Sequence, residues 1–451
     1  MKIIIVGCGK VGVTITEQLV KENHDITIID TKSEIVTDTA NRYDVMGVVG
    51  NGASLAVQRE AGIENADLLI AVTAADELNL LCCLIAKKAG NCSTIARVRN
   101  PLYSKEIGFI KEELGLSMII NPEYAAATEI ARILRFPSAI KIEPFAKGRV
   151  ELLKYKLPAN SKFAGCNLIE LSRITKAEVL ICAVERGEEV FIPNGSFVLQ
   201  EGDIICILSA PRNAKLYFDR LSVDTHQAKG TILIGGGKIA FYLAEQLSGS
   251  GIAVKIIERD KQRCDELSEL LPKATIINGD ATDQEVLLEE GIRNCDSVVT
   301  LTGIDEANIF LSLFAKSCSK AKVITKIDRI AFNEIIGTFD LGSLINPKSI
   351  TAEYIIRYVR AMQNSIGSKV EALYRIIENK AEALEFIVSK DSPVVGIPLE
   401  RMTLKKNLLI GCINHEGKII IPNGKSVIEG GDTVIVVTTQ TGLNDIKDIL
   451  R

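Results

Sequence analysis

The chain has 451 residues, 47% of them hydrophobic and 24% charged, and its formal net charge is -4. This length suits two to four globular domains of about 100–200 residues each, and the net charge gives no bulk attraction to nucleic acid or anionic lipid. The longest apolar stretches, such as residues 80–86, fall well short of the ~20 residues of a membrane span, and the start of the chain lacks a signal-peptide pattern, so we expect a cytosolic protein.

The first half of the chain alternates short apolar runs with amphipathic segments. The predicted strands are residues 2–6, 26–29, 45–49, 68–72 and 94–98, and the predicted helices are residues 11–21, 34–42, 55–61 and 77–88. Such an alternation predicts a parallel, doubly wound sheet. Pro122 opens a further helix over about residues 123–135 that ends before Pro137 and connects two lobes.

Beyond residue 138 the pattern changes to short runs at residues 150–156, 179–184 and 190–193, separated by Gly, Pro and Asn. The pair Asn194-Gly195 is a turn signal. We therefore predict a small β-rich lobe, closed by a helix near residues 215–221. Residues 222–229 are polar and read as a linker.

The two halves of the chain repeat each other. The landmarks recur 228 residues apart for Gly7 and Gly235, for Asp30 and Glu258, and for Gly52-Ala53-Ser54 and Asp280-Ala281-Thr282, and 229 residues apart for Thr73–Asn79 and Thr302–Asn308. Later landmarks pair Asn121-Pro122 with Asn346-Pro347, Ile192–Gly195 with Ile421–Gly424, and Gly202-Asp203 with Gly431-Asp432. Matching landmarks over nearly the whole chain indicate a tandem duplication.

The predicted fold class is therefore α/β, with two Rossmann-like parallel-sheet domains that are each followed by a small β-rich α+β lobe. The predicted boundaries are 1–121, 138–222, 229–346 and 369–451, with connecting helices at 122–137 and 347–368.

The turn Gly7-Cys8-Gly9-Lys10-Val11-Gly12 has the G-x-G-x-x-G pattern between a strand and a helix. The first glycine permits a tight turn, the second lets a pyrophosphate approach the backbone, and the third allows close helix–strand packing. The phosphate then meets free N–H groups at the helix N-terminus. Asp30 ends the next strand, where a carboxylate can accept hydrogen bonds from ribose hydroxyls. Because it would repel a 2′-phosphate, NAD(H) or another adenosine nucleotide is preferred over NADP(H).

The second copy reads Gly235-Gly236-Gly237-Lys238-Ile239-Ala240, so alanine replaces the third glycine. Glu258 replaces Asp30 and keeps its charge. The alternative for either copy is a degenerate Rossmann fold that packs its glycines and binds nothing, and a duplicated domain can lose one site by drift.

Further candidates follow the next strands. Thr73-Ala74 and its counterpart Thr302-Gly303 lie at a strand end, where ligands bind in open α/β sheets. Arg97 and its counterpart Lys326 end the following strand and could face a phosphate. Ordinary turn chemistry and a solvated surface charge remain the alternatives for these pairs.

Cysteine and histidine give no sign of a metal site or catalytic centre. Eleven cysteines are scattered without a C-x-x-C pair or Cys/His cluster, which favours small buried hydrophobic residues in a reducing compartment over reactive thiols. The three histidines, His24, His226 and His415, are far apart.

Taken together, these stretches resemble the TrkA family, the peripheral subunits of bacterial and archaeal Trk potassium-uptake systems, whose units are RCK domains. The residues that carry the resemblance are Gly7–Gly12, Asp30, Gly52-Ala53, Thr73–Asn79, Ala96-Arg97-Val98, Asn121-Pro122, Ile192–Gly195 and Gly202-Asp203. The resemblance covers essentially the whole chain. Three features differ between the two copies: Ala240, Lys326 and the pairing of Gly52 with Asp280. Because of these differences, the two sites need not be equivalent.

The resemblance implies a non-enzymatic, cytoplasmic ring, with a tetramer plausible, that is docked on an integral membrane potassium-translocating subunit of the TrkH/TrkG type. NAD(H) or ATP/ADP would bind at the residues named above, including Gly52, Ala53, Asp280 and Ala281, and shift the lobes. The competing hypotheses are an NAD-dependent oxidoreductase, an RCK-type regulator of a different cation channel, and a purely structural ring. An oxidoreductase needs an acid or base near the nicotinamide, and the companion lobes repeat no such group.

Overall fold

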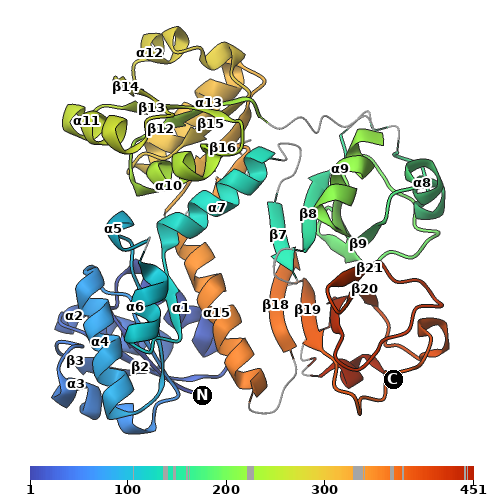
Figure 1. Cartoon of the computed structure of the whole chain (residues 1–451), viewed down its shortest axis with the longest axis horizontal. Helices are drawn as coiled ribbons and strands as arrows, with labels where there is room; N and C mark the ends of the chain where they lie inside the picture. Colours follow the sequence, from blue (N-terminus) through green and yellow to red (C-terminus); the bar gives the residue numbers. More distant parts are fainter. Residues whose placement is uncertain are drawn as a thin grey trace. The chain divides into compact units, whose positions relative to one another are not determined.

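The computed structural model describes residues 1–104, 106–135, 141–145, 149–158, 161, 163–220, 228–328, 339, 341–365, 370–377, 380–440, 443 and 445–451 (Figure 1). These residues form two compact units, Met1–Ala131 with Lys229–Ile356, and Arg132–Ala228 with Arg357–Arg451. Pro137 and most of the expected linker, residues 222–229, lie outside the described residues.

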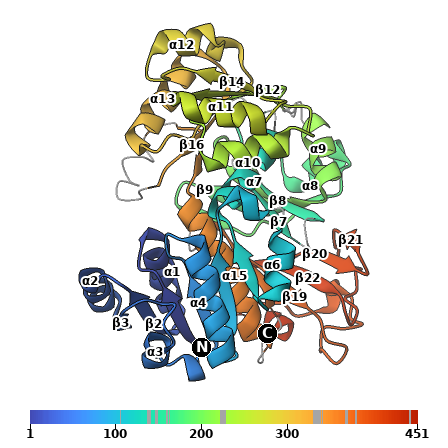
Figure 2. The ribbon, with the colours of Figure 1, turned by 60° about the vertical axis from the view of Figure 1, so that its left-hand side comes forward.

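The first unit begins with a Rossmann lobe. Its strands are β1 (Lys2–Val6), β2 (Asp25–Asp30), β3 (Met46–Val49), β4 (Leu68–Ala71), β5 (Ser93–Arg97) and β6 (Met118–Ile120). They form a parallel sheet in the order β3-β2-β1-β4-β5-β6. The helices and turns between them are α1 (Lys10–Lys21), α2 (Ser33–Tyr43), α3 (Leu55–Glu60), η1 (Ile63–Asn65), α4 (Asp76–Ala89), α5 (Pro101–Ser104) and α6 (Ile107–Glu113). Figure 2 shows α1 and α4 beside the strands of this sheet.

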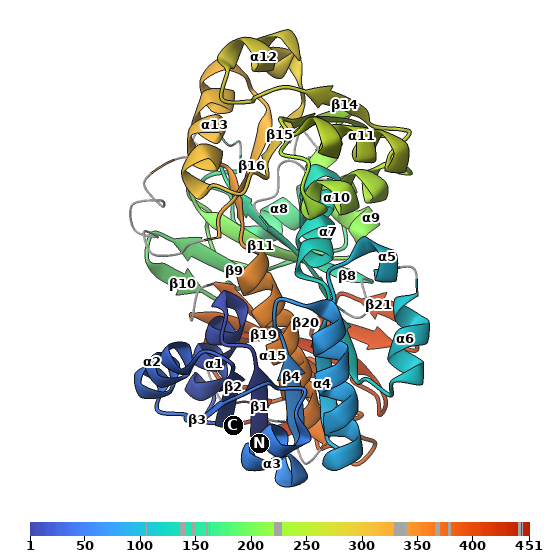
Figure 3. The same ribbon diagram turned by 90° about the vertical axis from the view of Figure 1, so that its left-hand side faces the viewer.

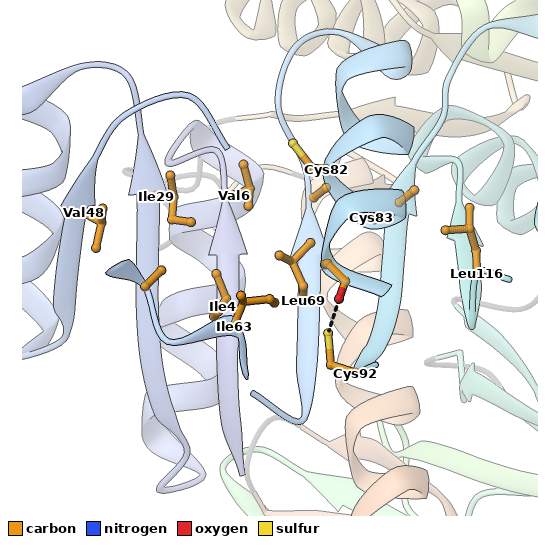
Figure 4. Close-up of a cluster of buried hydrophobic side chains, with 14 of the residues drawn as sticks. Ile4, Val6, Ile29, Val48, Ile63, Leu69, Cys82, Cys83, Cys92 and Leu116 are labelled. Carbon is orange, nitrogen blue, oxygen red and sulfur yellow. Dashed lines mark hydrogen bonds between the residues drawn. The ribbon is translucent and has the colours of Figure 1, made fainter. Parts of the chain in front are cut away.

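The central strands β1, β2, β4 and β5 are buried on both faces, which explains their largely apolar sequences. Successive side chains alternate between the faces, so Ile4 and Val6 join Leu69 in one core cluster. Cys82 and Cys83 of α4 pack into the same cluster, both with no exposed surface (Figure 4). These cysteines are thus the buried hydrophobic residues that the sequence predicted.

The second Rossmann lobe repeats this architecture. Its strands are β12 (Gly230–Ile234), β13 (Ala253–Glu258), β14 (Thr275–Asn278), β15 (Ser297–Thr300), β16 (Lys322–Lys326) and β17 (Ser343–Ile345), in the order β14-β13-β12-β15-β16-β17. The intervening elements are α10 (Lys238–Leu247), α11 (Lys261–Leu270), α12 (Gln284–Glu289), η3 (Ile292–Asn294) and α13 (Asp305–Cys318). Figure 3 shows this lobe with α13 beside β15 and β16.

The two Rossmann lobes contact each other through the helix that follows the first one, α7 (Pro122–Arg135). The Tyr242 hydroxyl of α10 donates to the Arg99 carbonyl oxygen (3.1 Å) and accepts from Asn121 Nδ2 (3.0 Å). The Tyr242 ring packs edge-on against Tyr124, with centroids 5.5 Å apart. The corresponding helix after the second lobe is α15 (Pro347–Ser365).

The second unit contains two antiparallel sheets. The first has the order β10-β9-β11-β8-β7, with β7 (Lys141–Phe145), β8 (Val150–Lys156), β9 (Val179–Arg186), β10 (Glu189–Phe191) and β11 (Ile204–Ser209), and carries α8 (Leu168–Thr175) and α9 (Pro211–Arg220). The second has the order β18-β19-β22-β20-β21, with β18 (Val370–Ile377), β19 (Ala381–Ile387), β20 (Leu408–His415), β21 (Lys418–Ile420) and β22 (Thr433–Thr438), and carries η4 (Leu399–Arg401) and η5 (Ile446–Ile449). We call these two lobes the first and second C-lobe.

One core cluster joins the C-lobes. Cys182 and Cys206 of the first pack together with Cys412 and Ile435 of the second. Each sheet therefore buries one face against the other, as in a sandwich.

The α/β fold class and its tandem repeat are confirmed, and the predicted strands and helices of the first lobe lie within one or two residues of those observed. The sequence missed α5, α6, β6 and α8, because elements of three to eight residues carry too little periodicity. The predicted Asn194-Gly195 turn is present, with Ser196 N–H donating to Asn194 Oδ1 at 3.1 Å. None of the described helices is long and apolar enough to cross a membrane.

Candidate functional site

The first glycine turn joins β1 to α1 with little space to spare. Gly7 has φ +99°, and a Cβ there would lie 2.9 Å from the Thr73 nitrogen. A Cβ on Gly12 would lie 1.9 Å from the Gly7 carbonyl oxygen. A Cβ on Gly9, in contrast, would meet no other atom within 4 Å. The turn is closed on its protein side and open at the helix N-terminus, as an approaching phosphate requires.

Asp30 is held against this turn. Its Oδ2 accepts a hydrogen bond from Cys8 N–H (2.8 Å) and its Oδ1 accepts one from Lys32 N–H (3.0 Å). Each oxygen keeps a further lone pair, so the carboxylate can still accept hydrogen bonds from a diol. Burial, together with the Asp30 charge, raises the pKa of the Cys8 thiol to about 12, which keeps this cysteine protonated and inert.

The second glycine turn keeps the positive φ of its first glycine and the open space at its second, although alanine replaces the third. Gly235 has φ +103°, and a Cβ on Gly237 would meet nothing within 4 Å. Glu258 reaches two backbone donors, Gly236 N–H (2.6 Å) and Asp260 N–H (2.9 Å), which match those of Asp30. The additional methylene of Glu258 therefore leaves the carboxylate in the equivalent place.

The predicted pairing of Gly52 with Asp280 is wrong by one residue. Gly50 N–H donates to the Asp30 carbonyl oxygen (2.9 Å), and Gly279 N–H donates to that of Glu258 (3.0 Å), so the two copies are 229 residues apart here. Asp280 therefore corresponds to Asn51. Both side chains accept from the backbone N–H two residues later, at 3.0 Å in the first copy and 2.9 Å in the second. The repeat changes register because the second copy has one more residue before this loop.

Gly52 itself contributes to packing. A Cβ at Gly52 would lie 2.2 Å from Val6 Cγ1. Its carbonyl oxygen accepts from the buried Gln58 Nε2 at 2.7 Å. Ala53 contributes its N–H to the Asn51 turn.

Thr73 is fixed by a buried asparagine. Asn79, with no exposed surface, accepts from Thr73 N–H (2.8 Å) and from the Thr73 hydroxyl (2.7 Å) through Oδ1. Its Nδ2 donates to the carbonyl oxygens of Thr73 (3.2 Å) and Arg97 (2.9 Å). The Arg97 guanidinium also donates to the Thr73 carbonyl oxygen. The polar groups of Thr73 are thus used within the protein, so its expected direct contact with a ligand remains a prediction.

The second copy repeats this network around Asn308. Its Oδ1 accepts from Thr302 N–H (2.9 Å) and the Thr302 hydroxyl (2.7 Å), and its Nδ2 donates to the carbonyl oxygens of Thr302 (3.2 Å) and Lys326 (3.0 Å). Lys326 Nζ donates to the Thr302 carbonyl oxygen at 3.2 Å. Lys326 is only 9% exposed, which excludes the alternative of a solvated surface charge.

A cavity of about 360 Å³ occupies the crevice of the second Rossmann lobe. Seven of the predicted residues line it: Gly235, Gly237, Glu258, Asp280, Ala281, Thr302 and Gly303. They come from the carboxyl ends of β12, β13, β14 and β15, where an open α/β sheet binds its ligand. The tertiary structure thus brings together residues up to 68 positions apart in the sequence.

A second cavity, of about 400 Å³, lies between the two Rossmann lobes of the first unit; we call it the interlobe cavity. Its charged lining comprises five basic residues, Arg97, Arg99, Lys238, Lys326 and Lys348, and two acidic residues, Glu123 and Asp328. Val11, Gly237, Ile239 and Thr302 also line it. Gly237 and Thr302 belong to both cavities, so a ligand in the crevice lies next to this basic lining.

Burial changes the ionisation of these groups. It lowers the pKa of Arg97, assisted by the neighbouring charge of Arg99. It raises the pKa of Glu123 against the opposing effect of Arg99, Lys238 and Arg97. It also lowers the pKa of Lys348, which the charge of Asp328 partly offsets. Burial disfavours the charged forms of these side chains, and most of the charged residues in the cavity are basic. An anionic ligand would compensate these positive charges, so the cavity favours an anion.

The two copies place opposite charges at corresponding positions of the interlobe cavity. In the first copy Arg99 Nη1 lies 3.9 Å from Glu123 Oε1. In the second copy the equivalents are Asp328 and Lys348, whose Oδ1 and Nζ lie 3.8 Å apart. The ion pair is retained with its signs exchanged, so the two copies present different charges to a ligand.

The sequence reasoning missed Arg99, Glu123, Asp328 and Lys348. A usable signal existed for Arg99, since two residues along an extended segment bring a side chain back to the same side as Arg97. The others belong to a cavity that exists only where two lobes meet.

The residues present fit an adenosine nucleotide. Open glycine turns at helix N-termini suit a pyrophosphate, and carboxylates held by two backbone donors suit ribose hydroxyls. Within the part of the chain that the structure describes, no group of three His, Cys, Asp or Glu side chains could hold a metal ion.

Sequence models of two domain families match the chain. The TrkA-N domain matches residues 3–122 and 231–347, and the TrkA-C domain matches residues 152–222 and 383–451. The chain belongs to the TrkA family. Its tandem organisation, N domain then C domain in each half, is the repeat inferred from the sequence.

Curated relatives match over the full length. A Trk system potassium uptake protein TrkA homolog from Methanosarcina mazei is 32% identical over 459 residues, covering 100% of both chains. The Trk system potassium uptake protein TrkA of Haemophilus influenzae is 33% identical over 458 residues, covering 100% of this chain and 97% of that protein.

Solved structures support the fold of this TrkA-family chain. A GsuK channel bound to NAD aligns with a TM-score of 0.63 and 16% identity, over 97% of this chain and 77% of that one. The GsuK RCK domain gives a TM-score of 0.63 over 97% and 92% of the two chains.

Proposed function

We propose that this chain is the nucleotide-responsive regulatory subunit of a potassium-uptake system. The single observation that carries the proposal is the pair of glycine turns, each open at the helix N-terminus and each beside an anchored carboxylate, Asp30 or Glu258. NAD(H) is the preferred ligand, with ATP or ADP as alternatives at the same sites. The full-length relatives are potassium uptake proteins by name, and a solved structure of the same fold, the GsuK channel, is bound to NAD.

Regulation would come from the interlobe cavity. A nucleotide whose ribose binds at Glu258 would direct its phosphates toward Gly237, where the crevice meets Lys238 and Lys326. A ligand shifts a conformational equilibrium only by binding one state better than another. A polyphosphate that reaches this basic lining would favour the arrangement in which both lobes contribute cations.

The partner would be an integral membrane potassium-translocating subunit of the TrkH/TrkG type, on whose cytoplasmic side the chain would assemble as a ring, plausibly a tetramer. The regulatory role would be non-enzymatic, with the nucleotide bound and released unchanged. We also propose that each half of the chain is divided into a Rossmann domain and a β-rich lobe at the boundaries that the sequence predicts.

Calorimetric titration of the full chain with NADH, ATP and ADP tests nucleotide binding. Asp30→Asn and Glu258→Gln each remove a charged acceptor, worth about 1.5–3 kcal/mol, so each should weaken its site by about 10- to 150-fold. Asp25→Asn is the matched control, because Asp25 is exposed at the opposite end of β2. Equal affinities in all four proteins would refute the assigned sites.

Affinity capture from detergent-solubilised membranes, with and without nucleotide, tests the partner. Recovery of an integral cation transporter, in a yield that nucleotide changes and Asp30→Asn blunts, is the expected result. Recovery of soluble proteins alone would contradict the regulatory role. Turnover of NADH with a small substrate would instead support an oxidoreductase.

A further inference from the structure

The two C-lobes contain equivalent carboxylate clamps that differ in their cation. In the first, Arg186 ends β9 and holds Asp203, which has no exposed surface. Arg186 Nε donates to Asp203 Oδ1 and Nη2 donates to Oδ2, both at 2.8 Å. Asp203 Oδ2 also accepts from Gln200 N–H (2.8 Å). The clamp fastens the end of β9 to the turn that precedes β11.

The second C-lobe has histidine in the place of this arginine. His415 ends β20, and its Nδ1 lies 2.7 Å from Oδ1 of Asp432, which is 2% exposed. Asp432 Oδ2 accepts from Glu429 N–H at 2.8 Å, as Asp203 does from Gln200. Each residue of the pair lies 229 positions after its counterpart. An arginine stays charged at every physiological pH, whereas a histidine loses its charge near neutrality.

The surroundings of His415 contain charges of both signs. Besides Asp432, three charged residues face His415. Glu429 Oε2 lies 4.0 Å from His415 Nε2, Glu416 lies in the β20–β21 turn, and Lys418 on β21 is the cross-strand partner of His415. Arg149 lies against Gly417 of the same turn, and Lys390 lies against Gly430, two residues before Asp432. The hydrogen bond to Asp432 raises the pKa of His415; burial opposes this effect, and the charges of Asp432, Glu429 and Glu416 raise the pKa further.

We propose that His415 and Asp432 form a pH-dependent clamp, which fastens the end of β20 to the turn before β22 at acidic pH and loosens as the pH rises. The first C-lobe, clamped by Arg186 and Asp203, does not respond. The chain would thus contain one pH-sensitive and one pH-insensitive copy of the same lobe.

The sign follows from the raised pKa of His415. The stabilisation is complete below the ordinary histidine pKa of about 6.5 and is lost as the pH rises through the higher value of the folded protein. A neutral imidazole protonated on Nδ1 still donates one hydrogen bond, but the buried Asp432 carboxylate then lacks a counter-charge. The backbone donor at Glu429 is unaffected, so the clamp weakens and the lobe stays folded.

Hydrogen exchange of the full chain, measured by mass spectrometry at about pH 6 and about pH 8.5, below and well above the ordinary histidine pKa of about 6.5, tests the proposal. After correction for intrinsic rates, protection of peptides over residues 408–420 and 427–434 should fall at the higher pH. Peptides over residues 179–191 and 198–206 in the same molecules are the internal control and should not change. An equal response in both lobes would overturn the proposal.

Two reciprocal substitutions make the test specific. His415→Arg should abolish the pH response of the second C-lobe, and Arg186→His should create one in the first. If Arg186→His does not fold, His415→Arg alone decides, and a pH response that survives it contradicts the clamp.

Titration by nuclear magnetic resonance supplies an independent readout. The chain has three histidines, and His415→Gln identifies the signal of His415 by its disappearance. That signal should titrate above about 6.5, the ordinary value. A midpoint at or below this value would refute the proposal.

Discussion

Replacing Asn79 by alanine would remove the side chain that fixes the turn after β4. Asn79 has no exposed surface and makes four hydrogen bonds, three with Thr73 and one with the Arg97 carbonyl oxygen. Alanine would leave the Thr73 N–H and the Arg97 carbonyl without these partners.

The cost can be worked out from these groups. A buried polar group that loses its partner costs about 1–3 kcal/mol. Two such groups give about 2–6 kcal/mol, and the lower half of this range applies because Thr73 is only half-buried. We therefore expect Asn79→Ala to reduce the local opening free energy by about 2–4 kcal/mol.

Hydrogen exchange of the full chain measures this free energy segment by segment, because lobes open independently. Peptides from β4 and α4 should lose protection in Asn79→Ala, while those from β15 and α13 should not. Asn308→Ala should give the reverse pattern, since Asn308 makes the same four bonds. Lys88→Ala, at an exposed position of α4, is the control. A loss below about 0.5 kcal/mol, the size of an ordinary surface substitution, would refute the reasoning.

Two further predictions concern packing. Gly12→Ala would place a methyl group 1.9 Å from the Gly7 carbonyl oxygen, and the strain of about 1–3 kcal/mol should outweigh the ~1 kcal/mol gain in helix propensity; thermal unfolding at an unchanged or higher temperature would contradict this. Burial raises the pKa of the Cys82 and Cys412 thiols to about 12, so an alkylating reagent near neutral pH should modify them only after unfolding. Modification of either cysteine in the native chain, detected by peptide mass spectrometry, would show that these thiols are accessible.

Local sequence patterns were enough to predict the Rossmann lobes. The central strands are largely apolar, as in the β-branched run of β1, and each glycine turn has a spacing that backbone geometry dictates. The positive φ of Gly7 and Gly235 and the anchored carboxylates of Asp30 and Glu258 follow from such short-range rules. The duplication could also be predicted from the sequence, because recognising it requires only a comparison of one half of the chain with the other.

The register of the repeat and the core shared by the C-lobes depend on contacts between segments that lie far apart in the sequence. Two copies aligned only by matching residues can be misaligned by one position. The backbone hydrogen bonds of Gly50 and Gly279 show that Asn51 corresponds to Asp280. The thiols of Cys182, Cys206 and Cys412 share a core that two separate sheets create.

The sequence by itself thus determined the fold class, the repeat and the glycine turns, since these depend on neighbours along the chain. The tertiary structure decided which charges share a space. Arg99, Glu123 and Lys348 lie far apart in sequence, yet they line one cavity with Lys238 and Lys326. Coulomb interactions depend on distance in space and on burial, and neither quantity can be read from the spacing of residues along the chain.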